Sequence, residues 1–175
     1  MRNSNPIDTE FFLRDVKEVA RDLLGTVLCI RKMDGSVVRS IINETEAYDG
    51  ENDLACHASR GKTPRTSVMY EKGGIWYVYL CYGMHWMLNV VVGDAGYPAA
   101  VLIRSTSEFS GPGRLTRGLG VNGSFHGKSL DPKDSLWIEE SNRKSKEIFC
   151  GPRIGVDYAG AKWSQKPYRF WVSNY

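Results

Sequence analysis

The segment from Glu44 to Tyr48 reads ETEAY and places two carboxyl groups and a phenol at alternate positions. In a β-strand, alternate side chains point to the same face, so Glu44, Glu46 and Tyr48 would share one. Two carboxyl groups held close together raise the pKa of one of them, and a carboxylate with a raised pKa suits a general base. An exposed polar face on an edge strand would show the same pattern. The segment therefore indicates an active site but leaves a purely structural face open.

The stretch from Tyr70 to Trp86 is rich in aromatic residues. Six of its 17 residues are aromatic, against 11% for the whole chain: Tyr70, Trp76, Tyr77, Tyr79, Tyr82 and Trp86. Tyr77 and Tyr79 would share one strand face, whereas Tyr82 falls in the turn between two strands, where burial is not expected. An exposed aromatic side chain at such a tip can insert between stacked bases, or it can form the centre of a protein contact.

His57 lies among small residues in LACHASR, where a structural role is the common one. A metal site would have to combine it with Glu44 or Glu46 and a third ligand. The other histidines, His85 and His126, lack the H-x-x-x-H spacing, and the four cysteines form no CxxC pair. We therefore expect no metal site, and free thiols in a reducing compartment.

A flat, positively charged heterocycle is the ligand best suited to several tyrosines and a histidine, because aromatic rings stack on its faces and attract its charge. A nearby carboxylate could then activate water for attack. Arg60, Lys62 and Arg65 in the loop, and the seven basic against two acidic residues of 141–175, would hold phosphates. A solvated surface would carry the same charges. Together these parts favour an enzyme that flips a nucleotide out of a duplex and cleaves its glycosidic bond.

The composition is that of one globular domain. The chain has 175 residues, a net charge of +3, 42% hydrophobic and 25% charged residues, which excludes a disordered chain, collagen and a coiled coil. A chain of this length typically forms one domain, so we expect a single domain over residues 1–175. It contains no apolar run of about 18 residues and no basic-then-apolar leader pattern at its start. We therefore expect a cytoplasmic protein without a membrane span.

The elements that position these residues follow from the hydrophobic pattern. Asp15 and Glu18 form a capping box before apolar residues at helical spacing, and Gly25 follows, which predicts a helix over 16–23. Alternating or β-branched stretches between turns predict the longer strands: 26–30 and 37–48, 75–81 and 85–92, and 99–104. Shorter segments complete the pattern: a helix over 111–120 and strands over 136–139, 153–156 and 168–172. Residues 49–67 form a long polar loop, and the whole predicts an α+β domain with mainly antiparallel strands.

Several motifs in a fixed order resemble the alkyladenine (3-methyladenine) DNA glycosylase family. They are ETEAY, a histidine nine residues beyond its tyrosine, KTPR, IWYVYLCYGMHWMLNV, AAVLIRS, GPGRLTRGLGV and GPRIGVDYAGAKWSQKPYRFWV, and they span roughly residues 9–173. Any one motif is weak, but the ordered combination is specific. The resemblance implies a curved antiparallel sheet with flanking helices and a protruding β-hairpin that enters the DNA minor groove.

The resemblance also implies an activity and a partner. The expected enzyme is a monomer that binds double-stranded DNA and removes damaged purines in base excision repair, without a metal or organic cofactor. Its expected substrates are alkylated and deaminated purines: 3-methyladenine, 7-methylguanine, hypoxanthine and ethenoadenine. No lysine lies within the pocket motifs, although Lys62 and Lys72 flank them. Because a lyase needs an amine nucleophile, we expect monofunctional hydrolysis.

The same resemblance implies roles for individual residues. Glu46 would be the general base for water, and Arg104 and the backbone of Ile154 would help to hold that water. Five residues would form the pocket. Tyr48, His57 and Tyr79 would stack the flipped base, and the backbone at Ala55 and His57 would offer hydrogen bonds to its edge. Asn89 would exclude the exocyclic amine of normal guanine. Outside the pocket, Tyr82 would fill the space left by the flipped nucleotide, and Met69 would touch the bases beside it.

Two functions of other classes remain open at this point. A metal-dependent hydrolase would use Glu44, Glu46 and His57, and it would lose its activity in excess EDTA. A non-catalytic module that binds nucleic acid or protein on the same fold would release no base from a methylated duplex.

Overall fold

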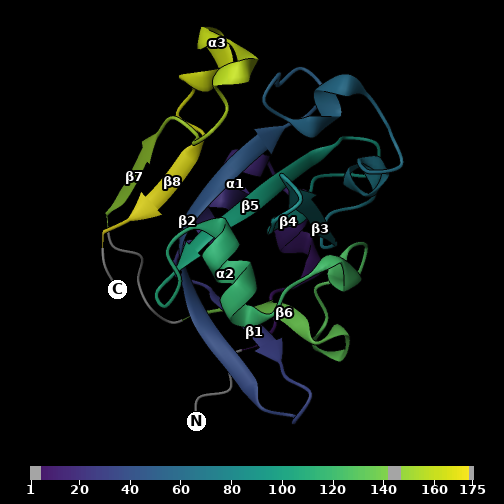
Figure 1. Ribbon diagram of the computed structural model, residues 1–175, viewed down its shortest axis with the longest axis vertical. Coiled ribbons are helices and arrows are strands. Elements are labelled where there is room, and N and C mark those ends of the chain that lie inside the picture. Colours follow the sequence, from purple (N-terminus) through teal and green to yellow (C-terminus); the bar gives the residue numbers. More distant parts are fainter. Residues whose placement is uncertain (1–4, 142–146, 174–175) are drawn as a thin grey trace.

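One antiparallel β-sheet forms the centre of the molecule (Figure 1). The computed structural model describes residues 5–141 and 147–173. In these residues the sheet has eight strands: β1 (Val27–Arg31), β2 (Val37–Asp49), β3 (Trp76–Cys81), β4 (His85–Val92), β5 (Ala99–Thr106), β6 (Leu136–Glu139), β7 (Ile148–Gly151) and β8 (Arg169–Val172). Six of them follow the order β3-β4-β5-β2-β1-β6, while β8 pairs with β2 and β7. All of these pairings are antiparallel, which confirms the predicted fold class.

Strand β2, 13 residues long, pairs with three other strands of the sheet. Along one edge it pairs first with β1 and then with β8, and along the other edge it pairs with β5. Its register against β5 shifts on both sides of Glu44. Such an irregularity bends a strand and re-aims its side chains, and bulges are common beside active sites. The bend therefore falls within the ETEAY segment.

Short helices accompany the sheet in the described part of the chain. They are α1 (Val16–Asp22), α2 (Pro112–Leu119), α3 (Ala161–Ser164) and the 3₁₀ helices η1 (Thr9–Leu13), η2 (His57–Arg60), η3 (Ser67–Tyr70), η4 (Gly123–Phe125), η5 (Pro132–Asp134) and η6 (Asp157–Ala159). The carboxylate of Asp15 caps α1 by accepting hydrogen bonds from the backbone of Lys17 and Glu18, as the capping box predicts. In Figure 1, α1 passes behind the sheet and α2 lies in front of its lower part. None of the described helices is long and apolar enough to cross a membrane.

The two faces of β2 have different neighbours. Thr45 and Ala47 face the main core, where the Thr45 hydroxyl donates to the carbonyl of Ala20 in α1. Glu44, Glu46 and Tyr48 point to the opposite face, which confirms the predicted alternation. On that face two smaller apolar clusters pack against Tyr48: one of Cys56, Ala58, Val68, Met69, Tyr77, Val91 and Ala100, and one of Ala55, Val156 and Ala159. The loops after β2 and β7 are thereby brought to one side of the sheet.

One predicted strand is wrong. Residues 153–156 form no strand, and the strand that precedes β8 is β7 instead. Pro152 has no N–H to continue the ladder, and Gly155 has a φ of +76°, a left-handed conformation outside the strand region. The segment turns across β2 and brings Ile154 to Glu46. The other predicted helices and strands are confirmed, with ends shifted by two residues at most.

Candidate active site

Glu46 is the buried centre of the site, with 0% of its surface exposed. Its Oε1 atom accepts a hydrogen bond of 2.8 Å from the backbone N–H of Ile154 and lies 3.4 Å from Nη1 of Arg104. Its Oε2 atom accepts a hydrogen bond of 2.8 Å from the hydroxyl of Tyr48. The predicted base, its predicted helpers and one predicted pocket residue therefore meet at one carboxyl group.

The pKa values of the two carboxyl groups on this face of β2 are shifted in opposite directions. Burial raises the pKa of Glu46, although the charge of Arg104 and the hydrogen bonds from Ile154 and Tyr48 oppose that rise. Burial would also raise the pKa of Glu44, but hydrogen bonds from Ser105 and other donors outweigh it, and the pKa of Glu44 lies below its usual value. Two carboxyl groups whose environments separate their pKa values are the usual mark of an acid–base site.

The physical reason expected from the sequence for the raised pKa needs correction. The charge of Glu44 does raise the pKa of Glu46, but burial is the larger cause and Glu44 contributes less than the three opposing groups. Arg104 lies between the two carboxylates, 3.2 Å from Glu44 and 3.4 Å from Glu46, so its positive charge reduces their repulsion. Desolvation, rather than a neighbouring negative charge, makes Glu46 basic.

Three aromatic side chains, those of His57, Tyr77 and Tyr79, form a group at the apolar cluster against which Tyr48 packs. The rings of His57 and Tyr79 lie 4.7 Å apart in an edge-to-face arrangement, and those of Tyr77 and Tyr79 lie 5.2 Å apart. Nδ1 of His57 lies 2.8 Å from the hydroxyl of Tyr77. Burial and the charges of Arg65 and Arg60 lower the pKa of His57 to about 4, so its imidazole is neutral at pH 7.

Tyr48 packs against the same apolar cluster as Tyr79, and that cluster contains Tyr77. Among the described residues, however, the ring of Tyr48 forms no stacked or edge-to-face pair with the ring of His57 or Tyr79. The guanidinium carbon of Arg153 lies 4.8 Å from the centre of the Tyr48 ring. Arg153 is 4% exposed and donates to the carbonyl of Ala47 and to both carboxylate oxygens of Asp53.

Asp53 and Arg153 are site residues that the sequence analysis missed. Asp53 also accepts hydrogen bonds from the backbone of Asp49 and Ala55, so the pair fixes the loop that leads to His57. The side chains of Asp53 and Arg153 are fully buried although their positions differ by 100 residues. No local pattern marks such a pair, because an isolated Asp in a polar loop and an Arg in a basic segment read as surface residues.

The two other expected pocket residues, Ala55 and Asn89, are both buried. Ala55 is buried, its N–H donates to Asp53, and its carbonyl accepts from the hydroxyl of Tyr158, so its backbone is already engaged. Asn89 is 3% exposed on β4, and its amide nitrogen donates to the carbonyls of Tyr77 and Met87.

The two residues expected to contact DNA outside the pocket differ in exposure. Tyr82 is 90% exposed at the tip of the β3–β4 hairpin, with a φ of +50° that is rare for a tyrosine. Leu80 and Met84 beside it are exposed as well, and they were not identified from the sequence. Met69 is 1% exposed and packs in the cluster that contains Tyr77. The side chain expected to contact bases beside the lesion is therefore packed in the apolar cluster rather than exposed, and its contact with DNA stays a prediction.

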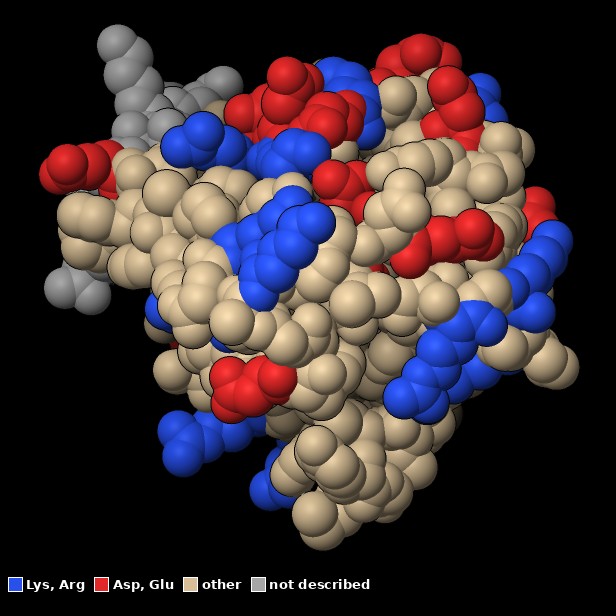
Figure 2. Space-filling model, turned by 90° about the horizontal axis from the view of Figure 1, so that it is seen from above, with Lys and Arg blue, Asp and Glu red and all other residues tan. Residues whose placement is uncertain are grey.

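The basic residues near the C-terminus are only partly free to bind phosphate. Arg143, Lys144 and Lys146 lie outside the described residues. Arg153 is paired with Asp53, and Arg169 is paired with Glu44, so neither is the free surface charge that the sequence suggests. Figure 2 shows Lys and Arg in separate groups on the face seen from above, interspersed with Asp and Glu. The described residues of that face therefore form no continuous basic surface.

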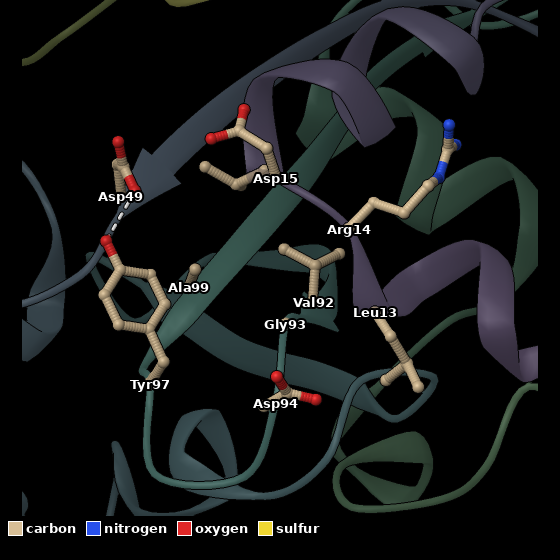
Figure 3. A pocket seen from close by; sticks show the side chains of 10 residues that line it. Leu13, Arg14, Asp15, Asp49, Val92, Gly93, Asp94, Tyr97 and Ala99 are labelled. Atoms are coloured by element: carbon tan, nitrogen blue, oxygen red, sulfur yellow. Dashed lines mark hydrogen bonds between the residues drawn. The ribbon is translucent and has the colours of Figure 1, made fainter.

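Two hollows lie away from this group of residues. One, of about 280 Å³, is lined by Leu13, Arg14, Asp15, Val16, Asp49, Val92, Gly93, Asp94, Tyr97 and Ala99 (Figure 3). There Asp49 accepts a hydrogen bond of 2.8 Å from the hydroxyl of Tyr97. The other, of about 300 Å³, is lined by Phe11, Arg21, Asp22, Leu24, Gly25, Thr26, Ser141 and Ile148. Neither contains a residue expected to act in catalysis or base binding, and among the described residues no group of three or more His, Cys, Asp or Glu could hold a metal ion.

The buried carboxyl group of Glu46 beside Arg104 suits the cleavage of a glycosidic bond, and the exposed Tyr82 at a hairpin tip suits insertion into DNA. The site therefore fits a hydrolase that acts on the N-glycosidic bonds of DNA. The chain belongs to the methylpurine-DNA glycosylase family, whose model matches residues 10–110 and 107–175. The chain is therefore a DNA glycosylase, a hydrolase of DNA repair that acts on alkylated bases.

Curated relatives agree with this family over most of their length. The chain is 44% identical over 170 residues to a protein of Anaeromyxobacter sp. (strain Fw109-5), covering 92% of this chain and 86% of the relative. It is 41% identical over 180 residues to a protein of Borreliella burgdorferi (strain ZS7), covering 96% of each. It is 40% identical over 186 residues to a protein of Psychrobacter cryohalolentis, covering 90% of this chain and 87% of the relative. All three relatives are named as candidate 3-methyladenine DNA glycosylases.

Proposed function

We propose that this glycosylase removes alkylated and deaminated purines from double-stranded DNA by monofunctional hydrolysis, acting as a cytoplasmic monomer. The proposed substrates are of the 3-methyladenine, 7-methylguanine, hypoxanthine and ethenoadenine class. The observation that carries the proposal is the environment of Glu46, whose carboxyl group is fully buried and yet held by three hydrogen-bonding or charged partners.

The geometry of Glu46 supports a role as general base. An ionised carboxylate accepts about four hydrogen bonds. Ile154 donates to Oε1, where Nη1 of Arg104 also lies 3.4 Å away as an ion-pair partner, and Tyr48 donates to Oε2. The position left on Oε2 can accept the proton of a water molecule as that water attacks the sugar. The negative charge of Glu46 would also stabilise the positive charge that develops on the sugar during glycosidic cleavage.

The aromatic side chains support binding of a flipped purine between Tyr48 and the pair of His57 and Tyr79. Base–aromatic stacking contributes about 1–3 kcal/mol per base and tolerates different bases. Because the imidazole of His57 is neutral at pH 7, it adds no positive charge that would repel an alkylated, cationic purine. Such a purine is already a good leaving group.

The experiment that tests the proposal is base release from duplexes that each carry one lesion. We expect free purine and an intact abasic strand, activity that persists in excess EDTA, and no protein–DNA adduct after borohydride treatment. Loss of activity in EDTA would favour a metal-dependent hydrolase, and a trapped adduct would favour a lyase. Binding without release of any base would leave only a nucleic-acid-binding module.

Replacing Tyr82 by alanine is expected to weaken binding to a paired lesion by roughly 1–3 kcal/mol, the usual contribution of one base–aromatic stack. Extruding a nucleotide loses stacking and pairing, and an inserted side chain recovers part of that loss. The exposure of Tyr82 and its left-handed backbone support this role, because such strain persists mainly at functional sites.

The measurement for Tyr82 is the ratio of lesion affinities, duplex over single strand, at one salt concentration, since phosphate contacts depend strongly on salt. Binding to single-stranded DNA should change much less, because no vacated space needs filling there. Tyr97→Ala, which removes a 51% exposed tyrosine beside Asp49, is the matched control. An unchanged ratio in Tyr82→Ala would show that Tyr82 does not fill the space that the flipped nucleotide leaves in the duplex.

Replacing Asn89 by serine is expected to raise the release of guanine derivatives relative to hypoxanthine by about tenfold, the lower range for steric discrimination by one group. The amide of Asn89 is held by two backbone carbonyls, so the side chain cannot swing away from a 2-amino group. The measurement compares release rates of 7-methylguanine and hypoxanthine in both proteins. If the ratio of the two release rates is the same in both proteins, Asn89 stabilises the strand and does not determine substrate specificity.

A further inference from the structure

Two carboxylates and two guanidinium groups form one connected cluster on the site face of the sheet. Arg104 donates from Nε to Oε1 of Glu44 over 3.2 Å, and its Nη1 faces Oε1 of Glu46 at 3.4 Å. Arg169 donates from Nη1 to the same Oε1 atom of Glu44 over 3.0 Å. The formal charges of these four groups sum to zero. Glu44 therefore faces two cations, while Glu46 shares one of them.

Neighbouring groups fix the outer members of this cluster. The hydroxyl of Ser105 donates to Oε2 of Glu44 over 2.8 Å and accepts from the backbone N–H of Gly111 over 2.9 Å. Nε of Arg169 donates to the carbonyl of Pro152 over 2.9 Å, and its guanidinium lies 4.3 Å from the centre of the Trp171 ring. Glu44 and Arg169 therefore have few other orientations available.

We propose that Glu44 and Arg169 are positioning residues that act on Glu46 through charge: Glu44 offsets part of the positive charge of Arg104, and Arg169 holds Glu44 in place and offsets its negative charge. The proposal rests on the proposed role of Glu46 as general base. Glu44 is held by three donors, which leaves it little capacity to act on water itself. Its lowered pKa keeps it a permanent anion at working pH.

This arrangement predicts opposite effects for removing the two outer charges. Without the charge of Glu44, Arg104 and Arg169 leave the cluster positive, which favours the carboxylate form of Glu46. Without the charge of Arg169, the cluster is negative, which disfavours that form. Among the described residues, the other charged or titratable groups that act on Glu46 are the hydroxyl of Tyr48 and the guanidinium of Arg153, and both substitutions leave these in place.

The test is the single-turnover excision rate as a function of pH, at saturating enzyme and on duplex DNA methylated with dimethyl sulfate, after subtraction of spontaneous release. The acidic limb of the profile reports the ionisation of Glu46. We expect Glu44→Gln to move this limb to lower pH by about 0.5–1 unit and Arg169→Gln to move it to higher pH by a similar amount. The double variant should return it close to its original position.

Three further variants keep the test decisive. Arg169→Lys retains the charge, so its limb should lie near that of the unmodified protein. Glu10→Gln and Lys133→Gln remove the same charges at exposed positions and should leave the limb unchanged. If Glu44→Gln fails to fold, the comparison of Arg169→Gln with Arg169→Lys still decides, because only the former should shift the limb.

Each unfavourable outcome has a separate meaning. If Arg169→Gln and Glu44→Gln shift the limb in the same direction, or leave it in place, the positioning role is wrong. An equal shift in Arg169→Lys and Arg169→Gln also overturns it, because charge would then not be the cause. Full excision activity in Glu46→Gln would overturn the role of Glu46 as general base, on which this proposal rests, and that is a distinct result.

Discussion

Replacing Glu46 by glutamine is expected to lower the rate of base excision by at least about a hundredfold, the lower range for loss of a general base. The amide keeps the size of the side chain but can no longer accept the proton of the attacking water. It also removes the negative charge that would stabilise the developing cation on the sugar.

The variant is expected to fold and to bind its substrate. The amide oxygen can accept from Ile154 and Arg104 in the place of Oε1, and the amide nitrogen can donate to the hydroxyl of Tyr48. The aromatic residues around the pocket are unchanged. Affinity for a lesion-containing duplex should therefore stay close to that of the unmodified protein.

The measurement is the single-turnover rate at saturating enzyme, which separates chemistry from binding. Glu10→Gln, which removes the same charge at an exposed position, is the control and should excise bases at the normal rate. The thermal midpoint of each variant should be recorded, because a rate lost through unfolding carries no information on chemistry. A folded Glu46→Gln protein with near-normal turnover would contradict the proposed mechanism.

Replacing Asp53 by alanine is expected to lower the free energy of unfolding by about 3–5 kcal/mol, the usual cost of removing one partner of a buried ion pair. Both side chains of the Asp53–Arg153 pair are fully buried. Without Asp53, the guanidinium of Arg153 loses two hydrogen bonds, and the backbone N–H groups of Asp49 and Ala55 lose their acceptor. A buried charge without compensation is the main cause of the predicted loss.

The measurement is urea unfolding at pH 7, compared with Asp22→Ala. Asp22 forms an ion pair with Arg14 in which the two side chains are 52% and 38% exposed, so its loss should change stability by less than about 1 kcal/mol. Asp53→Asn keeps one carbonyl acceptor, so its loss of unfolding free energy should lie between those of Asp53→Ala and Asp22→Ala. A loss below about 1 kcal/mol in Asp53→Ala would mean that the pair does not hold the loop.

Much of the fold and part of the site could be predicted from local patterns. The alternation of Glu44, Glu46 and Tyr48 sets a common face because side-chain direction in a strand has a period of two residues. Asp15 predicts the start of α1 because a cap acts within one turn. The turn position of Tyr82 predicts its exposure because the turn connects two paired strands. Each of these inferences needs only residues that are close together in the chain.

The tertiary structure decided what surrounds those residues. Ile154 reaches Glu46, and Arg169 reaches Glu44, across 108 and 125 positions of the chain. Residues 153–156 read as a strand, but the backbone leaves the sheet after Gly151, and Ile154 then reaches Glu46. The family resemblance assigns Met69 a contact with DNA, but the packing of η3 onto the sheet buries its side chain.

The chemical character of Glu46 also depended on the folded structure. The sequence by itself determines which side chains share a face of β2, because side-chain direction along a strand depends only on local geometry. Whether the pKa of Glu46 rises or falls was decided by desolvation and by the charge of Arg104 on a neighbouring strand. Burial and Coulomb interactions depend on distances in space, and segments far apart in the chain set those distances only when the sheet and its loops are assembled.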